Sequence, residues 1–226
     1  SRFLDGIFES SLLPAAVELL NERACALLAP ELAAGFSGGG VGVAVALEGV
    51  EEAVGRMGRE SKEMGLAAGS QGYFHLEGHA HDRFWEQYSH LGRTLVERFP
   101  GLVSVRANFP VSGYSEMFDL AGGLAREKQI AVVILAHAGS GTALIHFVPF
   151  QGEEADPDGV VSVVEKLRER CAGMGGNLIV ERASSALKEK TAFWGPEPEA
   201  LVVMKRIKEQ MDPDRLFCPG RFVGGI

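Results

Sequence analysis

Residues 130–150 read IAVVILAHAGSGTALIHFVPF and contain no Asp, Glu, Lys or Arg. An uncharged run of this length could nominally cross a bilayer. The tripeptide Gly-Ser-Gly at 139–141 interrupts the run, however. Its two histidines, His137 and His146, would also be costly in lipid. We therefore predict two buried strands joined by a tight turn.

The regions around this run alternate between short strand-like runs rich in Val, Ile and Phe and longer runs with helical spacing. Together with the strands of the run, these regions form two predicted strand-helix-strand units. In the first unit a helix over 114–128 joins strands over 102–109 and 130–136, and in the second a helix over 159–174 joins strands over 144–150 and 178–181. This order predicts an α+β fold with duplicated ferredoxin-like β-α-β units, in which helices cover an antiparallel sheet.

The N-terminal part carries a weaker form of the same pattern. It predicts strands over 41–47 and 73–76 and helices over 51–64 and 82–90. Residues 11–20 have a spacing that permits a helix, whereas Pro14 and the resemblance described below favour a strand that enters the sheet. The boundary between two halves, 1–90 and 91–226, is expected within residues 77–100. No low-complexity linker separates the halves, so we expect them to share one sheet.

Composition narrows the classes of function. The formal net charge of the 226 residues is -8, which argues against nucleic acid, because phosphate binding needs clustered Lys and Arg. Cys25, Cys171 and Cys218 are far apart and form no C-x-x-C pair, so neither a disulfide framework nor a zinc knuckle is predicted. A cytoplasmic location fits best. Because the chain begins at Ser1 without an initiator Met, we expect a fragment of a longer polypeptide.

Two glycine-rich segments look like site motifs in residue type but not in context. The run Gly38-Gly39-Gly40 looks like a phosphate loop, but a dinucleotide site needs a strand before the glycines and a helix after them, and here a strand follows. A plain loop is the favoured interpretation. Ser140 looks like the nucleophile of an elbow, yet position 138 is not Gly and no helix follows directly, so a hairpin turn is predicted.

Three histidines, His75, His79 and His81, form the densest cluster of potential metal ligands. An exposed loop explains them as well, and we predict no metal site. Arg106 lies on a predicted strand, where its guanidinium could face an anionic substrate or serve as a surface or interdomain charge. His137 could be a core or turn histidine with both nitrogens partnered, or could lie at a site.

The C-terminal residues 211–222 read MDPDRLFCPGRF. A helix with Leu201, Met204, Ile207 and Met211 on one face is expected to end at residue 212, because the following proline cannot continue it. The Pro-Gly pair at 219–220 then defines a corner in the chain. The sequence predicts an ordered C-terminus.

Three segments carry a family resemblance. The pairs I-K at 207–208 and D-P at 212–213, followed by C-P-G-R at 218–221, resemble the terminal signature of FAD-linked oxidases of the vanillyl-alcohol-oxidase type, with Cys218 where Asn is usual. The segment AHAGSG at 136–141 is similar to that of the FAD-binding subunit of glycolate oxidase. Catalytic subunits of glycolate and D-lactate oxidoreductases instead read H-x-G-D-G-N-x-H. The segment between 179 and 196 also looks like that FAD-binding subunit.

This resemblance implies the C-terminal cap domain of an FAD-linked oxidase. In that family FAD is held mainly by an N-terminal domain, which nothing in this chain resembles. The candidate catalytic residues are His137 and Arg106. The candidate cofactor-binding residues are Gly139, Ser140, Cys218, Pro219, Gly220 and Arg221.

The implied activity is oxidation of a small 2-hydroxy acid such as glycolate or lactate. The isolated chain is expected to be inactive, and its partners to be the N-terminal FAD-binding domain together with sister catalytic and iron-sulfur subunits. Those subunits could bring it to a membrane that it does not span. The alternative is a self-contained ferredoxin-like module for ligand binding or assembly. The two hypotheses differ in what precedes Ser1.

Overall fold

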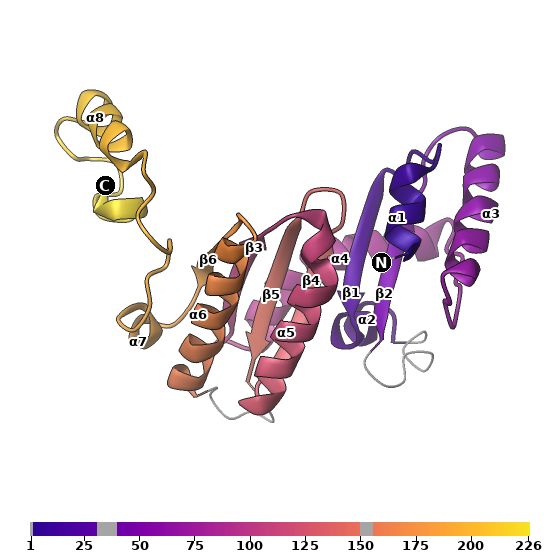
Figure 1. The fold of residues 1–226 in the computed structure, drawn as a ribbon, viewed down its shortest axis with the longest axis horizontal. Helices are drawn as coiled ribbons and strands as arrows, with labels where there is room; N and C mark the ends of the chain where they lie inside the picture. The colour runs from indigo at the N-terminus through magenta and orange to yellow at the C-terminus, as the bar shows by residue number, and fades with distance from the viewer. Residues whose placement is uncertain (1, 31–39, 150–155) are drawn as a thin grey trace.

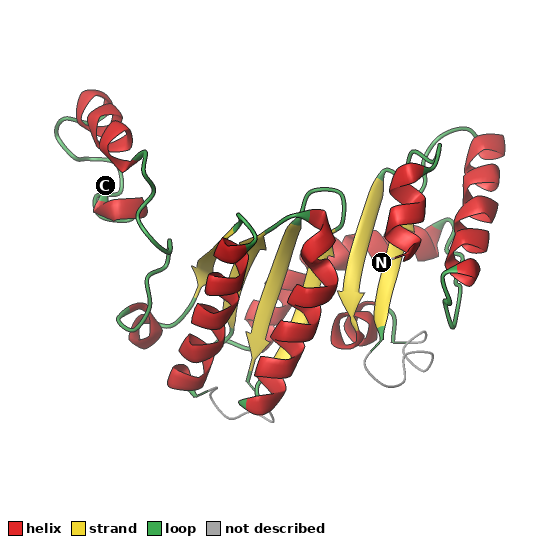
Figure 2. Ribbon diagram, in the orientation of Figure 1, coloured by secondary structure: helices red, strands yellow, loops and turns green. Residues whose placement is uncertain are grey.

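The computed structural model describes residues 2–30, 40–149 and 156–226. Six strands form one sheet in the order β2-β1-β4-β5-β3-β6, and every neighbouring pair is antiparallel. Figures 1 and 2 show this sheet at the centre, with an arm that extends beyond β6 toward the C-terminus. The strands are β1 (Ala16–Asn21), β2 (Val41–Ala46), β3 (Val103–Asn108), β4 (Ala131–His137), β5 (Thr142–Val148) and β6 (Asn177–Arg182).

The ferredoxin-like arrangement is present between β3 and β6. Helix α5 (Tyr114–Glu127) connects β3 to β4, and α6 (Pro157–Gly173) connects β5 to β6. Each pair of connected strands encloses one strand of the other pair, which gives the interleaved order β4-β5-β3-β6. The predicted α+β fold is therefore confirmed. The first half of the chain adds β1 and β2 to the β4 edge rather than a second complete four-stranded unit.

Most predicted elements are observed, and two predictions need correction. Residues 73–76 form no strand: Tyr73 and Phe74 are exposed and no strand pairs with them. The helix expected over 82–90 is longer, because α4 runs from His79 to Arg98 through the region predicted to separate the halves. The uncharged run forms β4, a turn and β5, as expected. No helix in the described ranges is long and apolar enough to span a membrane.

One face of the sheet carries the larger hydrophobic core. Helices α5 and α6 pack there with α1 (Arg2–Glu9) and α3 (Glu51–Ala67), on the near side in Figure 2. Alternate strand residues such as Val105, Ile134, Ile145 and Phe147 point into this layer and are almost fully buried. Asp156 caps the start of α6 by accepting hydrogen bonds from the backbone of residues 158 and 159.

The opposite face is only partly covered. Helix α4 and the short α2 (Glu22–Leu28) bury Leu20, Val133 and Leu135 in a second, smaller core. Asn21 ends β1 and caps α2, and it also hydrogen-bonds Val132 and Ile134 of β4. Toward β3 and β6 this face carries polar side chains that are half-buried or exposed. The polar side chains on β3 and β6 therefore form a surface beside the second core.

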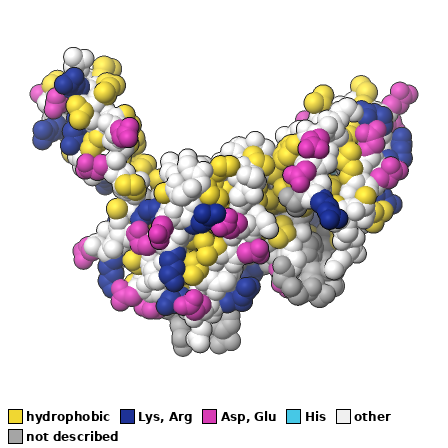
Figure 3. All heavy atoms as spheres, in the orientation of Figure 1, with side chains coloured by type: hydrophobic (Ala, Val, Ile, Leu, Met, Phe, Trp, Pro, Cys, Tyr) yellow, Lys and Arg dark blue, Asp and Glu magenta, His cyan; other side chains and the backbone are white. Residues whose placement is uncertain are grey.

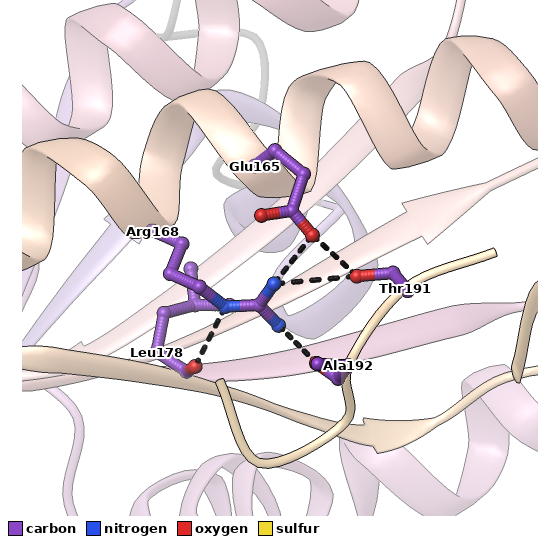
Figure 4. Close-up of polar contacts among 5 residues, drawn as sticks. All are labelled: Glu165, Arg168, Leu178, Thr191 and Ala192. Carbon is purple, nitrogen blue, oxygen red and sulfur yellow. Dashed lines mark hydrogen bonds and ion pairs between the residues drawn. The ribbon is translucent and has the colours of Figure 1, made fainter. Parts of the chain in front are cut away.

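A buried arginine ties the sheet to the segment that follows β6. The Arg168 side chain is 9% exposed. Its guanidinium donates to the backbone oxygens of Leu178 and Ala192, at 3.3 and 2.6 Å, to Thr191 Oγ1 at 3.2 Å and to Glu165 Oε1 at 2.5 Å. Figure 4 shows these contacts converging from α6, β6 and the segment after α7 (Ser185–Lys188). Arg168 therefore fixes the point from which the C-terminal arm leaves the sheet.

The arm contains α8 (Leu201–Met211) and a final 3-10 turn (Val223–Gly225). Only Leu201, Asp212 and Val223 in this stretch are buried. On the predicted apolar face Leu201 is buried and Met204 is half-buried, whereas Ile207 and Met211 are 57% and 77% exposed. Hydrophobic side chains are accordingly visible on the surface of the arm in Figure 3. The helix is confirmed, and the final turn covers Leu201, but Ile207 and Met211 at the C-terminal end of the apolar face have no covering element among the described residues.

Replacing Arg168 with Ala should lower the free energy of unfolding by about 3 kcal/mol, because two buried carbonyl groups lose their donor. Chemical denaturation measures this loss. Arg170→Ala is the matched control on the same helix, since Arg170 pairs with Glu116 at the surface, with Nη2 2.5 Å from Oε2. Its effect should be much smaller. Equal losses in the two variants would contradict the assigned role of Arg168.

Candidate functional site

A row of polar side chains crosses the partly covered face at one register. Glu18 on β1 pairs with His137 on β4, and His137 pairs with Thr142 on β5. Thr142 in turn pairs with Asn108 on β3, which pairs with Asn177 on β6. Directly opposite residues on adjacent strands point to the same face. The antiparallel register therefore aligns five polar side chains across five strands.

The half of the row on β5, β3 and β6 is a chain of hydrogen bonds. Thr142 Oγ1 donates to Asn108 Oδ1 at 3.0 Å, and Asn108 Nδ2 donates to Asn177 Oδ1 at 2.8 Å. Thr142 and Asn108 are half-buried, and Asn177 is exposed. This part of the row is a surface of amide and hydroxyl groups that a small polar ligand could contact.

The other half of the row contains a buried carboxyl group. Glu18 is 0% exposed, and its Oε2 accepts a short hydrogen bond from the Tyr88 hydroxyl of α4. Its Oε1 lies 2.5 Å from Nδ1 of His137, whose side chain is 60% exposed. One edge of the imidazole thus faces the protein interior while much of the ring faces outward. Neither Glu18 nor Tyr88 was predicted as a site residue.

Burial dominates the acid-base behaviour of this cluster. It raises the pKa of Glu18 above the usual range, and the Tyr88 hydrogen bond and the His137 imidazole oppose that shift. Burial, reinforced by the Glu18 carboxyl, also raises the pKa of Tyr88. The phenol therefore stays protonated and acts as a hydrogen-bond donor.

The turn after β4 holds the predicted residues Gly139 and Ser140 beside His137. The predicted hairpin is confirmed, and Tyr114 of α5 fixes it through a short hydrogen bond to the His137 carbonyl oxygen. Gly141 has a φ of +70°, and a Cβ there would lie 2.1 Å from the Phe109 oxygen, so this position requires glycine. A shallow cavity of about 240 Å³ opens beside the turn. It is lined by Phe8, Pro14, Ala15, Ala16, Val17, His137, Gly139 and Ser140.

Arg106 lies one row further along the same face. Its Nε is 2.5 Å from Glu181 Oε1, and its side chain is 41% exposed. In the described part of the chain neither of its Nη groups makes another hydrogen bond or ion pair. The guanidinium is therefore partly neutralised by Glu181 but still has donors facing outward.

The second imidazole of this face is buried and differs from His137. His146 is 4% exposed, its Nδ1 lies 2.8 Å from the Ser104 hydroxyl, and Gly92 of α4 packs over it. Burial lowers its pKa to about 4. His146 is thus a neutral core side chain, as α4 leaves it no access to solvent.

The remaining predicted cofactor-binding residues lie on the arm. Asp212 fixes the turn after α8 by accepting from the backbone of Leu216 and Phe217, at 2.8 and 3.0 Å, and by pairing with Lys208 Nζ at 2.6 Å. Lys208 lowers the pKa of Asp212. Cys218 follows with a φ of +47°. Within the described ranges, no hydrogen bond or ion pair joins residues 218–221 to the 138–141 turn.

The other motifs have simple locations. Gly38 and Gly39 lie outside the described residues, and Gly40 directly precedes β2. His75 and His81 each contact one neighbouring carboxylate, Glu77 at 3.3 Å and Asp82 at 3.1 Å. Across residues 2–30, 40–149 and 156–226, no three His, Cys, Asp or Glu side chains are grouped so that they could hold a metal ion.

Comparison with known proteins gives one family. The model of the family described as "FAD linked oxidases, C-terminal domain" matches residues 2–222, which is nearly the whole chain. No curated protein matches significantly.

Glu18→Gln should gain stability relative to the wild type as the pH rises from about 4 to about 8. A carboxyl with a raised folded-state pKa contributes full stability below its unfolded pKa and loses it as the pH rises through the folded pKa. Gln avoids this loss. Glu116→Gln is the control with opposite sign, because Arg170 lowers the pKa of Glu116. Denaturation curves across this pH range test both signs, and parallel curves for E18Q and wild type would refute the first.

Cys218→Asn should strengthen the turn in the arm. An ordinary L-residue with positive φ costs roughly 1–2 kcal/mol, and Asn adopts this region more readily. The amide of Arg221 donates to the Cys218 carbonyl at 3.2 Å, so its hydrogen exchange should slow by roughly 2–5-fold. Cys218→Gly should have the same effect and Cys218→Ala should not. Identical exchange in all three variants would show that this backbone strain is unimportant.

Proposed function

We propose, from the premise that this chain belongs to the family of FAD-linked oxidase C-terminal domains, that it is the substrate-side cap of a flavoenzyme. Its substrate would be a small 2-hydroxy acid such as glycolate or lactate. The observation that carries the proposal is the polar row that contains His137, on the face of the sheet that α4 leaves partly open.

The chemistry of that face suits a small hydroxy acid. Asn108 and Asn177 offer amide groups, Thr142 offers a hydroxyl, and Arg106 has outward donors one row away. A guanidinium binds a carboxylate through two parallel hydrogen bonds. An imidazole can accept a proton from a hydroxyl group. One face thus presents a carboxylate-binding group on β3 and a base on β4, with β5 between the two strands.

The residues of this chain suit contact with the flavin ring of FAD but do not form a complete FAD pocket. Ligand pockets typically have volumes of about 300–1,000 Å³, whereas the cavity beside His137 measures about 240 Å³ and is shallow. A dinucleotide also needs helix N-termini or a glycine-rich turn for its pyrophosphate. The residues around the polar row could cover a flat ring and a small substrate. They favour a cap over a complete FAD site, so the rest of the cofactor would be held by an N-terminal FAD-binding domain.

The division of labour follows from oxidation of a hydroxy acid to an oxo acid. When bound, FAD supplies the acceptor for the hydride that leaves the α-carbon. His137 would take the proton that leaves the hydroxyl group. Arg106 would hold the carboxylate with its outward Nη groups while Glu181 fixes its Nε edge. The sheet face itself would exclude water from the reacting atoms.

The turn and the arm would complete the contact with the cofactor domain. Gly139 and Ser140 lie beside His137 and would face the flavin. Cys218, Pro219, Gly220 and Arg221 sit on the arm, where Phe217 and Phe222 are 69% and 49% exposed. Exposed aromatic side chains of this kind favour an interface with another domain. Sister catalytic and iron-sulfur subunits would be additional partners.

A self-contained ferredoxin-like module would have the same sheet. The family match and the uncovered apolar face of the arm favour the cap, because a module that acts alone gains nothing from exposing Ile207 and Met211. The two functions predict different cofactor content, and that difference can be measured directly.

The purified chain should carry no stoichiometric flavin, whereas a polypeptide that joins it to its flavin domain should be yellow. Visible absorption measures both. Under anaerobic conditions glycolate or lactate should bleach the joined protein, and propionate, which lacks the 2-hydroxyl group of lactate, should not. The His137→Gln variant should slow bleaching by roughly 10²–10⁴-fold, the usual contribution of a general base.

Each outcome has a clear reading. Stoichiometric flavin in the chain alone would contradict the cap. A joined protein that binds flavin but is bleached by no hydroxy acid would retain the cap and exclude this substrate class.

A further inference from the structure

Glu18 is an acidic side chain at a buried strand position where packing of the fold does not require an acid. It lies in β1 between Val17 and Leu19, which point into the larger core, and before Leu20, which packs in the second core. A carboxylate without exposure is costly unless it is paired and hydrogen-bonded. Both of its oxygens are in contact, one with Tyr88 and the other with His137. The cluster therefore has the form of a clamp on one edge of the imidazole.

The donors and acceptors around Glu18 indicate which ring nitrogen of His137 carries the hydrogen. An ionised carboxylate only accepts hydrogen bonds, and the Tyr88 hydroxyl donates to Oε2. Nδ1 of His137 lies 2.5 Å from Oε1, which has no other donor among the described residues, so a hydrogen on Nδ1 is the one placed to satisfy this buried oxygen. A neutral imidazole carries one hydrogen, so Nε2 is left with a lone pair. The clamp thus selects one of two tautomers.

His146 shows what an unclamped imidazole on the same face looks like. Its Nδ1 contacts the hydroxyl of Ser104, and a hydroxyl can donate or accept. That contact selects no tautomer. A carboxylate is present beside the exposed histidine and absent from the contacts of the buried one, so the selection is confined to the ring that a ligand could reach.

We propose that Glu18 and Tyr88 are positioning residues that hold the hydrogen of His137 on Nδ1 and leave Nε2 as the proton acceptor of the site. This inference rests on the proposed function for the identity of the proton donor, a substrate hydroxyl group. Tyr88 orients the carboxylate, Glu18 orients the imidazole, and only His137 touches the substrate. The same carboxylate-imidazole logic sets the tautomer in serine proteases.

The tautomer of His137 can be measured without flavin or substrate. In the ¹⁵N-labelled chain, long-range correlations between imidazole protons and nitrogens distinguish protonated from unprotonated ring nitrogens. At about pH 8.5, above the usual pKa of an imidazole, His137 should have its hydrogen on Nδ1. The chain has six histidines, and the loss of one spin system in His137→Gln assigns the signal. A wild-type ring with its hydrogen on Nε2 would overturn the proposal.

Glu18→Gln provides the directional test. Tyr88 still needs an acceptor, so the Gln carbonyl oxygen should turn toward it and the amide group toward His137. Nδ1 must then accept, and the hydrogen should move to Nε2. The double variant E18Q/Y88F frees the amide to rotate and should restore a mixture of tautomers. An unchanged tautomer in E18Q would contradict the role of Glu18 in setting the tautomer of His137. If the spectrum of E18Q/Y88F were the same as that of E18Q, Tyr88 would have no part in orienting residue 18.

Glu181→Gln is the matched control, because it neutralises another carboxylate of the same face without contact to His137. It should leave the tautomer unchanged, and a shift equal to that of E18Q would overturn the proposal by showing a general effect of charge. If E18Q does not fold, the wild-type spectrum still tests the proposal, because it shows whether the His137 hydrogen is on Nδ1 or on Nε2. Because these spectra contain no flavin, failure of the clamp and failure of the proposed function are separate results.

Discussion

The close approach of the β4–β5 turn to the end of β3 is the contact on which the polar row depends. Gly141 passes so near the Phe109 carbonyl that no side chain fits, and the Phe109 amide donates to the Gly141 oxygen at 2.8 Å. This pairing sets Thr142 opposite both His137 and Asn108. A slip of one residue would turn every side chain of a strand to the other face. The position of the site is thus a consequence of one glycine.

The elements around this turn could be predicted because their sequence has a single interpretation. A long uncharged run broken by glycines fits two buried strands, and the spacing of Met117, Ala121 and Leu124 fits a helix on the core. Tyr73 and Phe74 show the limit. Their residue types favour a strand, but a strand needs a partner, and the sequence does not reveal that no strand of the described sheet pairs with these exposed residues.

The candidate site was only half accessible from sequence. His137 was identified by its motif, whereas Glu18 and Tyr88 are 70 residues apart and meet only after α4 folds over the sheet. A signal did exist in β1. Glu18 interrupts a run in which Val17, Leu19 and Leu20 are apolar, so neither face of the strand offers a charge easy access to water. An acid in such a strand is a reason to look for a partner.

The three thiols of the chain differ in a way that makes the arm observable. Burial raises the pKa of Cys25 and Cys171 to about 11, so both are poor nucleophiles at neutral pH. Cys218 is exposed and lies on the arm, between α8 and the final 3-10 turn. A maleimide dye would therefore attach at one native position, at the segment expected to meet the flavin domain. Cys218, at the position where Asn is expected, thus provides a native site for a fluorescent label that reports binding of the flavin domain.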